Sequence, residues 1–537
     1  MYCRILESGP NCFRRLRVAS GLIRLSFRPA INVKWKVSGM ANKSMRIAIA
    51  GGGPSGLTLA SILGREASNK EAFDITIFER GAADRDQGSG WDVDEAGQTA
   101  LIRAGVELKS IQRPDSDRQR SYRVDDMDQP IAAFGLPSSI SKLGSIKEQL
   151  GLLASPSLET ERKKMVDGLT NALSSNTKIF YEAYISGLEQ NDDGSIEVFG
   201  RDGSTLDGRF DVVIDASGSS SSLRSTRFTH EVEARYTGTS YVQGQIDLPE
   251  QTLDPGIIDR IGEGTLNLYG PTQDGKGTQS LNFQRFGADP SNQVTTAWIE
   301  IHTHSASQLK EELGFEGIYE MTRDPAAVQR AKDFVKQQLS GFPEQHQTLF
   351  DSIDGARVLT FTIHPACEEA LEHTTPDSEG LPFLSIGDAL HALPPWSGMS
   401  GNYALRDAAD LATSLIQQQR KDWTPTSVAA SLRGHEVDFM RRTDKKRKTV
   451  DRSPELGDYM DSTDFKDFVL AAKLLGKPPR DEWKTEDEID VAVMAETVRF
   501  FLILNSLDNY GMRTANELTS VNRRCHTSTE ESVKLAT

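Results

Sequence analysis

The feature that most constrains the fold is a glycine-rich turn between a short apolar strand and a helix. Residues 46–50 form the strand, residues 57–63 show helical spacing and residues 73–79 read as a second strand, which together make a βαβ unit of about 35 residues. The turn has the pattern Gly51-x-Gly53-x-x-Gly56, and its variable positions before the last glycine are Pro54 and Ser55. The pattern predicts a dinucleotide site, with a pyrophosphate at the N-terminus of the helix.

An acidic residue at the end of the second strand supports this interpretation. Glu79 stands 23 positions after Gly56, and Arg80 follows it. A carboxylate at this point can accept hydrogen bonds from the ribose hydroxyls of a dinucleotide. A glycine-rich turn without a ligand does not explain the acid. The unit alone does not distinguish NAD from FAD.

A second motif, far downstream, separates the two cofactors. Residues 383–388 read as a buried strand that ends in a turn at Gly387-Asp388. Asp388 can hold a ribityl or ribose hydroxyl, and the turn presents backbone N–H groups at the start of a helix. Such a helix N-terminus stabilises negative charge at the N1–C2=O edge of a reduced flavin. The predicted cofactor is therefore FAD, with further contacts from Pro395, Gly398, Gly401 and Asn402.

These motifs resemble those of the class A flavoprotein monooxygenases, the single-component aromatic hydroxylases. The family pattern G-D-A-x-H-x-x-x-P-x-x-G-x-G-x-N matches here, except that Ser400 stands for the second glycine and Gly401 is shifted by one. Residues 211–224 are similar to the family fingerprint D-x-x-x-x-A-D-G-x-x-S-x-x-R, with Ser217 in place of the usual Asp. A Ser-rich loop is the alternative interpretation of that segment.

Two further segments resemble the tetracycline-modifying flavin monooxygenases most closely. Residues 88–101 are similar to a G-x-x-L-D-L turn that leads into a helix, and Arg162 matches the arginine of an I-x-R-x-x-L pattern. The resemblance implies that Asp92 lies near the isoalloxazine or ribityl chain, and that Arg162 contacts the flavin or its pyrophosphate. The alternative for Arg162 is a solvated helix residue among basic neighbours.

The resemblance also implies a reaction. NADPH or NADH reduces a non-covalently bound FAD, O2 forms a C4a-hydroperoxide on it, and one oxygen hydroxylates or epoxidises a small electron-rich substrate of secondary metabolism. That substrate is phenolic, polyketide-like or another aromatic. No catalytic acid or base is predicted. Two alternatives stay open, namely an FAD-dependent reductase or epoxidase of a prenyl-type substrate and a non-catalytic dinucleotide-binding protein.

The expected fold is α/β, with a Rossmann-like FAD-binding domain of the GR2 type, an inserted antiparallel β-sheet domain for the substrate and a helical C-terminal region. The predicted ranges are 45–227 and 366–420 for the FAD domain, 228–365 for the sheet and 421–537 for the helical extension. Residues 1–44 carry nine basic residues against one acid. They read as a disordered leader upstream of the true start or as a mitochondrial presequence.

Composition excludes several classes of function. A net charge of −16 argues against nucleic acid as a partner, and the four scattered cysteines indicate a reducing compartment such as the cytoplasm. No apolar run reaches the ~18 residues of a membrane span. No metal is expected, because His302 and His304 lack a third ligand at useful spacing. The basic run at 441–448 favours a solvated helix end over a localisation signal. The expected partners are a small-molecule substrate and O2, in a monomer or homodimer.

Overall fold

The computed structural model divides into two compact units, Met1–Asn42 and Lys43–Thr537. In the first unit, β1 (Leu16–Val18) pairs antiparallel with β2 (Gly21–Ile23). The structure describes these two strands and residues 44–452, apart from isolated positions and the segments 113–118, 135–156, 247–264, 272–277 and 287–293. No helix in the described part of the chain has the length and apolar character that crossing a membrane requires.

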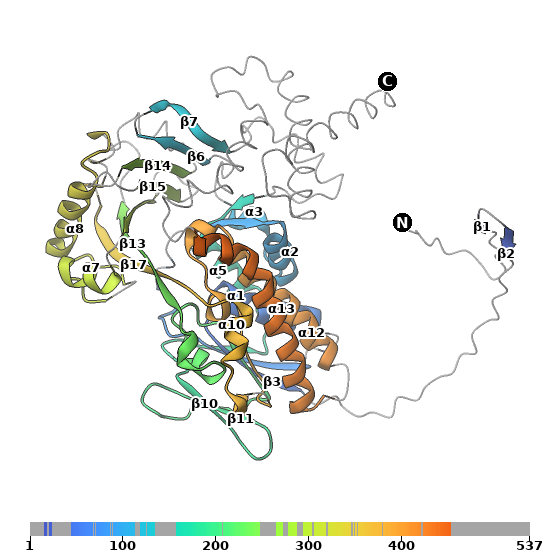
Figure 1. Cartoon of the computed structure of the whole chain (residues 1–537). Helices are drawn as coiled ribbons and strands as arrows, with labels where there is room; N and C mark the ends of the chain where they lie inside the picture. Colours follow the sequence, from blue (N-terminus) through green and yellow to red (C-terminus); the bar gives the residue numbers. More distant parts are fainter. Residues whose placement is uncertain are drawn as a thin grey trace. The chain divides into compact units, whose positions relative to one another are not determined.

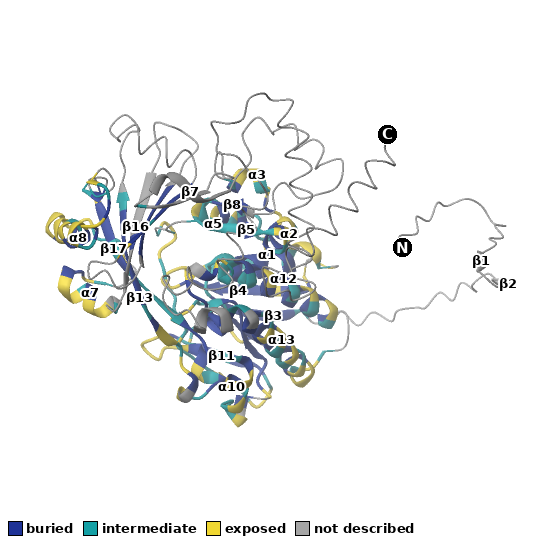
Figure 2. Ribbon diagram, turned by 45° about the horizontal axis from the view of Figure 1, so that its top comes forward, coloured by how far each residue is buried: buried dark blue, intermediate teal, exposed yellow. Residues whose placement is uncertain are grey.

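The second unit contains a five-stranded parallel sheet with the strand order β18-β12-β3-β4-β9. Its central strand, β3, is labelled in Figure 1. The strands of the sheet are β3 (Met45–Ala50), β4 (Phe73–Phe78), β9 (Thr177–Phe180), β12 (Val212–Asp215) and β18 (Phe383–Ser385). Strands β3, β12 and β18 are almost entirely buried, as Figure 2 shows for β3, because both faces of the sheet are covered. Strand β3, helix α1 (Pro54–Glu66) and strand β4 confirm the predicted βαβ unit.

Helices cover one face of this sheet and share a single apolar core with it. The principal ones are α1, α2 (Glu95–Ala104), α5 (Arg162–Asn171), α12 (Ser400–Gln419) and α13 (Pro425–Arg452). The opposite face packs against the hairpin of β10 (Gly187–Gln190) and β11 (Ile196–Phe199). Shorter elements are β5 (Asp92–Asp94), which pairs with β8 (Ser157–Glu159), and the helices α3 (Leu108–Ile111), α10 (Cys367–Glu372) and α11 (Asp388–His391).

A second, seven-stranded sheet has the order β17-β13-β16-β15-β14-β6-β7 and is antiparallel except where β14 meets β6. Its strands are β6 (Gln119–Arg123), β7 (Asp126–Phe134), β13 (Arg235–Ile246), β14 (Thr265–Pro271), β15 (Thr278–Phe286), β16 (Val294–His302) and β17 (Gly355–Ile363). Alternate residues such as Val242, Leu268 and Phe283 pack against α7 (Ala306–Leu313) and α8 (Pro325–Gln338). The strand expected around 295–301 is confirmed as part of β16.

The course of the chain differs from the predicted ranges in two places. Strands β6 and β7 come from the range expected for the FAD domain, yet they hydrogen-bond into the second sheet through the parallel pairing of β6 with β14. Helix α13 comes from the range expected for the helical extension, yet its residues Leu432 and Phe439 belong to the core beneath the first sheet. Pairing and packing partners that lie far away in the sequence decide both placements.

Candidate active site

The glycine turn forms a cradle at the carboxyl end of β3. Gly51 has a φ of +107°, and a Cβ there would lie 2.4 Å from the carbonyl oxygen of Ala216. A Cβ on Gly56 would lie 2.2 Å from the carbonyl oxygen of Gly51, whereas one on Gly53 would meet nothing within 4 Å. No side chain caps α1, which begins at Pro54, so its first N–H groups face this open space. The backbone N–H groups of such a turn can donate hydrogen bonds to the oxygens of a phosphate group.

Glu79 occupies the predicted position beside this cradle and is buried. Its Oε2 accepts a hydrogen bond from the backbone N–H of Gly52 at 2.7 Å, and its Oε1 accepts one from Gly81 at 2.8 Å. Its ion-pair partner is Arg85, whose Nε lies 3.3 Å from Oε1, whereas the predicted Arg80 is exposed. A cavity of about 300 Å³ adjoins the carboxylate and is lined by Gly52, Glu79, Arg85, Gln87, Lys163 and Tyr181, among others.

Arg162 lies between the glycine turn and the downstream motif. Its Nε is buried and has no hydrogen-bond partner among the described residues. Burial, followed by the charge of Arg85, lowers the pKa of the guanidinium to about 10, against the attraction of Asp388 and Glu79. The side chain is therefore no solvated helix residue. Its guanidinium lies within electrostatic reach of Arg85, Asp388 and Glu79.

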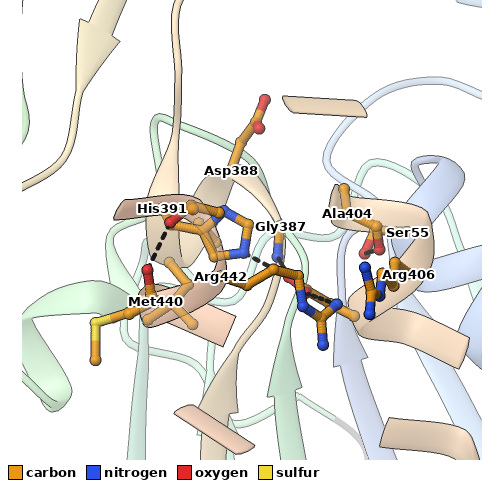
Figure 3. Close-up of polar contacts among 12 residues, drawn as sticks. Ser55, Gly387, Asp388, His391, Ala404, Arg406, Met440 and Arg442 are labelled. Carbon is orange, nitrogen blue, oxygen red and sulfur yellow. Dashed lines mark hydrogen bonds and ion pairs between the residues drawn. The ribbon is translucent and has the colours of Figure 1, made fainter. Parts of the chain in front are cut away.

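A buried carboxylate, that of Asp407, holds the turn after β18. Gly387 has a φ of +59°, and its N–H donates to Asp407 Oδ2 at 3.1 Å. His391 Nε2 lies 2.5 Å from the same oxygen, and Arg442 Nη1 lies 3.3 Å from Asp407 Oδ1. Figure 3 shows the carboxyl group of Asp388 pointing away from this cluster. Asp407 therefore fixes the turn, while the carboxyl group of Asp388 points to the side where the glycine turn at Gly51 lies.

The start of α12 carries the remaining predicted contacts. Pro395 and Gly398, with a φ of +67°, form the preceding turn. Asn402 is buried, donates to the carbonyl oxygen of Asp92 at 2.9 Å and accepts from the N–H of Asp94 at 3.0 Å. The side chain of Asn402 thus binds β5 like a neighbouring peptide group, and it brings Asp92 to the N-terminus of α12.

The second fingerprint is built on a residue that the sequence reasoning did not single out. Asp215 is fully buried and accepts hydrogen bonds from the hydroxyls of Ser217 at 2.5 Å, Ser221 at 2.6 Å and Ser385 at 2.9 Å. Burial raises the pKa of its carboxyl group. The hydroxyl of Ser217 is therefore directed inward to Asp215. The sequence feature that could have identified Asp215 is its position, three residues before Gly218 of the fingerprint.

Arg224 connects this fingerprint to the downstream turn. Its Nη1 donates to the carbonyl oxygen of Leu390 at 2.7 Å, and its guanidinium lies 4.6 Å from the ring centroid of Phe228. Burial lowers its pKa to about 10. The interaction joins segments 166 positions apart, so the fingerprint and the turn form one structure.

The predicted residues thus meet at one edge of the first sheet. Gly51, Glu79, Ser217 and Asp388 follow β3, β4, β12 and β18, which are parallel, so their carboxyl ends lie together. Ligands of open α/β sheets bind at this edge. The open glycine cradle, the buried acid and Arg162, whose Nε has no hydrogen-bond partner among the described residues, are compatible with a dinucleotide at this edge. Among the described residues, no group of three or more His, Cys, Asp or Glu side chains could hold a metal.

Comparisons with known proteins identify solved structures that share this fold. No protein-family model matches the chain. The solved structure of 2,6-dihydroxypyridine-3-hydroxylase from Arthrobacter nicotinovorans matches with a TM-score of 0.57 and 17% identity, covering 78% of this chain and 93% of that one. Klebsiella pneumoniae HpxO in complex with FAD and uric acid matches with a TM-score of 0.55 and 16% identity over 80% and 93%. A salicylate hydroxylase substrate complex matches with a TM-score of 0.53 and 17% identity over the same shares. The chain has the fold of these two hydroxylases and of the FAD-bound HpxO.

Proposed function

We propose that the protein is an FAD-dependent monooxygenase that uses NADPH or NADH and O2 to hydroxylate or epoxidise a small electron-rich substrate. The observation that carries this proposal is the meeting of the Gly51 turn, Glu79 and the Gly387-Asp388 turn at one sheet edge. Near them lies Arg162, whose Nε has no hydrogen-bond partner in the described part of the chain. Bound FAD would supply electron transfer and oxygen activation. The protein would supply binding, orientation and exclusion of water.

The second sheet is the proposed substrate-binding wall. The face turned away from α7 and α8 carries buried amide side chains, with Gln243, Asn267, Asn282 and Gln284 between 2% and 7% exposed. Strand register places Gln243 and Asn282 on either side of position 298 and pairs Asn282 with Asn267, so three of them lie in one row. Such a wall suits a flat substrate with several hydrogen-bonding groups.

Contacts with β8 support the view that this face looks toward the flavin. Thr265 and Gln284, next to the amide row on the same face, hydrogen-bond with Glu159 of β8, and Gln284 Nε2 lies 3.3 Å from Glu159 Oε1. Glu159 precedes Arg162 by only three positions. The polar face and the expected flavin site are therefore neighbours.

Arg357 gives the row a cationic end. It pairs with Gln243 across strands β17 and β13, and its Nε donates to Gln243 Oε1 at 2.5 Å. Its charge also lowers the pKa of Arg162, so the two guanidinium groups lie close enough to repel each other. We propose that the substrate carries an acidic oxygen, such as a carboxylate, phenolate or enolate, and that Arg357 and Gln243 bind it. The similar HpxO structure was solved with uric acid.

A substrate screen tests the proposal. Purified protein reconstituted with FAD is given NADPH or NADH and a panel of phenols, hydroxy-heteroaromatics, polyketide-like enols and prenyl alkenes. We expect nucleotide oxidation stimulated by an acidic aromatic or enol, with a product that gains one oxygen atom. Arg357→Met should raise KM for that compound far more than it lowers kcat, whereas Arg323→Met, a half-exposed arginine paired with Asp354, should change neither.

Other outcomes separate the alternatives. Anaerobic NADPH oxidation that reduces a prenyl alkene would establish the reductase instead. FAD uptake without turnover of any compound would favour the non-catalytic binding protein. A wild-type protein that takes up no FAD would exclude both flavin functions. The tetracycline-modifying subtype stays a prediction, because function belongs to the site and not to the fold.

A further inference from the structure

Trp91 lies at the start of β5, beside the first turn of α12. Its backbone oxygen accepts hydrogen bonds from the backbone N–H of Thr160 at 3.2 Å and from the Thr160 hydroxyl at 2.9 Å. Its indole packs directly against Gly401, where a Cβ would lie 2.6 Å from Trp91 Nε1. The neighbouring strand is held by Asn402. The indole is therefore fixed at the point where α12 begins.

The indole N–H of Trp91 is a buried donor without an acceptor. Nε1 has no hydrogen-bond partner among the described residues, although it is shielded from solvent. Buried polar groups in native proteins are almost always paired, and the N–H of a buried tryptophan finds a partner in particular. An acceptor that the polypeptide itself does not supply is expected at this position.

The polar side chains around the start of α12 do not fill that role. The hydroxyl of Ser400 donates to Asp388 Oδ1, and the amide of Asn402 is used by the backbone of β5. What remains at this end of α12 is a helix N-terminus, which attracts an electronegative group, and the N–H of Trp91 beside it. Both features select the same kind of ligand atom, a carbonyl oxygen that can carry negative charge.

We propose that Trp91 is a flavin-contacting residue whose indole packs against the ring end of FAD and whose Nε1–H donates to a flavin carbonyl oxygen. The inference rests on the proposed binding of FAD. It also gives one explanation for two differences from the family patterns. Trp91 stands in the position of the first Leu of G-x-x-L-D-L, and the second glycine of the downstream motif is shifted to position 401. The indole requires a glycine at 401, and the serine that replaces the pattern glycine at 400 binds Asp388.

Flavin fluorescence tests the contact without reference to turnover. Indole quenches excited flavin by electron transfer only at contact distance, so FAD bound to the wild-type protein should emit weakly. Trp91→Phe keeps an aromatic ring but removes the N–H and most of the quenching. We expect bound-FAD emission to rise several-fold and the Kd for FAD, titrated into the apoprotein, to rise about 3- to 10-fold for one lost hydrogen bond. Trp423→Phe is the control, because Trp423 packs against the core at the segment before α13.

A second variant keeps the test independent of the Trp91 substitution. Gly401→Ala should displace the indole and weaken FAD binding while Trp91 is still present, and the effect should shrink in a Trp91→Leu background, where a Cβ has room. Unchanged emission and unchanged Kd in Trp91→Phe, with an unchanged unfolding temperature, would overturn the contact alone. A wild-type apoprotein that binds no FAD would overturn the proposed function as well, so the two failures are distinguishable.

Discussion

The carboxylate of Asp407 and the backbone N–H of Gly387 are joined by a 3.1 Å hydrogen bond from α12 to the turn after β18. Asp407 is completely buried, and its two oxygens meet His391 Nε2 and Arg442 Nη1. Figure 3 shows these two side chains beside Gly387. One carboxylate thereby fixes the positive φ of Gly387 and the direction of Asp388.

Replacing this carboxylate should loosen the turn. We expect Asp407→Asn to lower the free energy of unfolding by roughly 3 kcal/mol, because it breaks a buried charge pair and leaves Arg442 with a weaker partner. FAD affinity should fall in parallel. Asp410→Asn is the control, since Asp410 is half-exposed and its contact with Arg442 should contribute less than about 1 kcal/mol. Urea unfolding and FAD titration measure both, and equal losses in the two variants would contradict this role.

Two glycines of the cradle should respond in different ways. Gly51→Ala should destabilise the protein by about 1–3 kcal/mol even without FAD, because φ is positive and the Cβ would clash with Ala216. Gly53 has a φ of −82° and open space around it, so Gly53→Ala should leave the unfolding temperature of the apoprotein unchanged. It should nevertheless impair FAD binding strongly, since the new methyl group points into the cradle. Normal FAD affinity in Gly53→Ala would exclude a pyrophosphate there.

Arg162 should contribute to binding at the expense of apoprotein stability. Arg162→Met removes a partly buried cation whose Nε has no hydrogen-bond partner among the described residues, so the apoprotein should melt at a higher temperature. The Kd for FAD should rise about 10- to 100-fold through the loss of a charge-assisted hydrogen bond. Because the guanidinium has a pKa of about 10 and is charged below it, wild-type affinity should decline as the pH rises through that value. Lys178→Met, an exposed lysine on β9, should show neither effect.

Acid should destabilise the protein through His364. Its Nδ1 accepts a hydrogen bond from the N–H of Ala392 at 3.1 Å, and burial, followed by the charge of Arg224, holds its pKa well below 6.5. The unfolded chain therefore binds more protons than the folded one below about pH 6.5, and stability is lost as the pH falls through that value. His364→Gln should flatten the dependence of the unfolding temperature between about pH 7 and 5. An identical slope in the variant would assign the acid sensitivity to other groups.

The local motifs of the site were readable from the sequence, and the partners that hold them were not. The Gly51 turn and Glu79 follow from short-range pattern, because strand, turn and helix signals are contiguous. The pairing of Glu79 with Arg85, and the packing of Trp91 on Gly401, depend on side-chain directions that spacing does not give. The cytoplasmic or mitochondrial location and the monomeric or dimeric state stay predictions.

The basic run at 441–448 shows the same limit. It was expected to be a solvated helix end, yet the side chains of Arg442 and Arg447 are only 17% and 8% exposed. Arg442 is mostly buried because it meets Asp407 of α12, whereas Arg447 pairs within its own helix with the buried Asp444. A run of charges along a helix does not reveal which of its members meet acids from another element.

Helix α13 also determines when this protein can finish folding during synthesis. Glu436 neutralises the buried Arg227 at 2.8 Å, and Arg442 reaches Asp407. A nascent chain that has emerged only to residue 420 already contains every strand of both sheets, yet Arg227 and Asp407 lack their counter-charges. The seven-stranded sheet, which is complete by residue 363, can form before then. We therefore expect the domain that begins with the first glycine motif to become stable only after α13 has been synthesised.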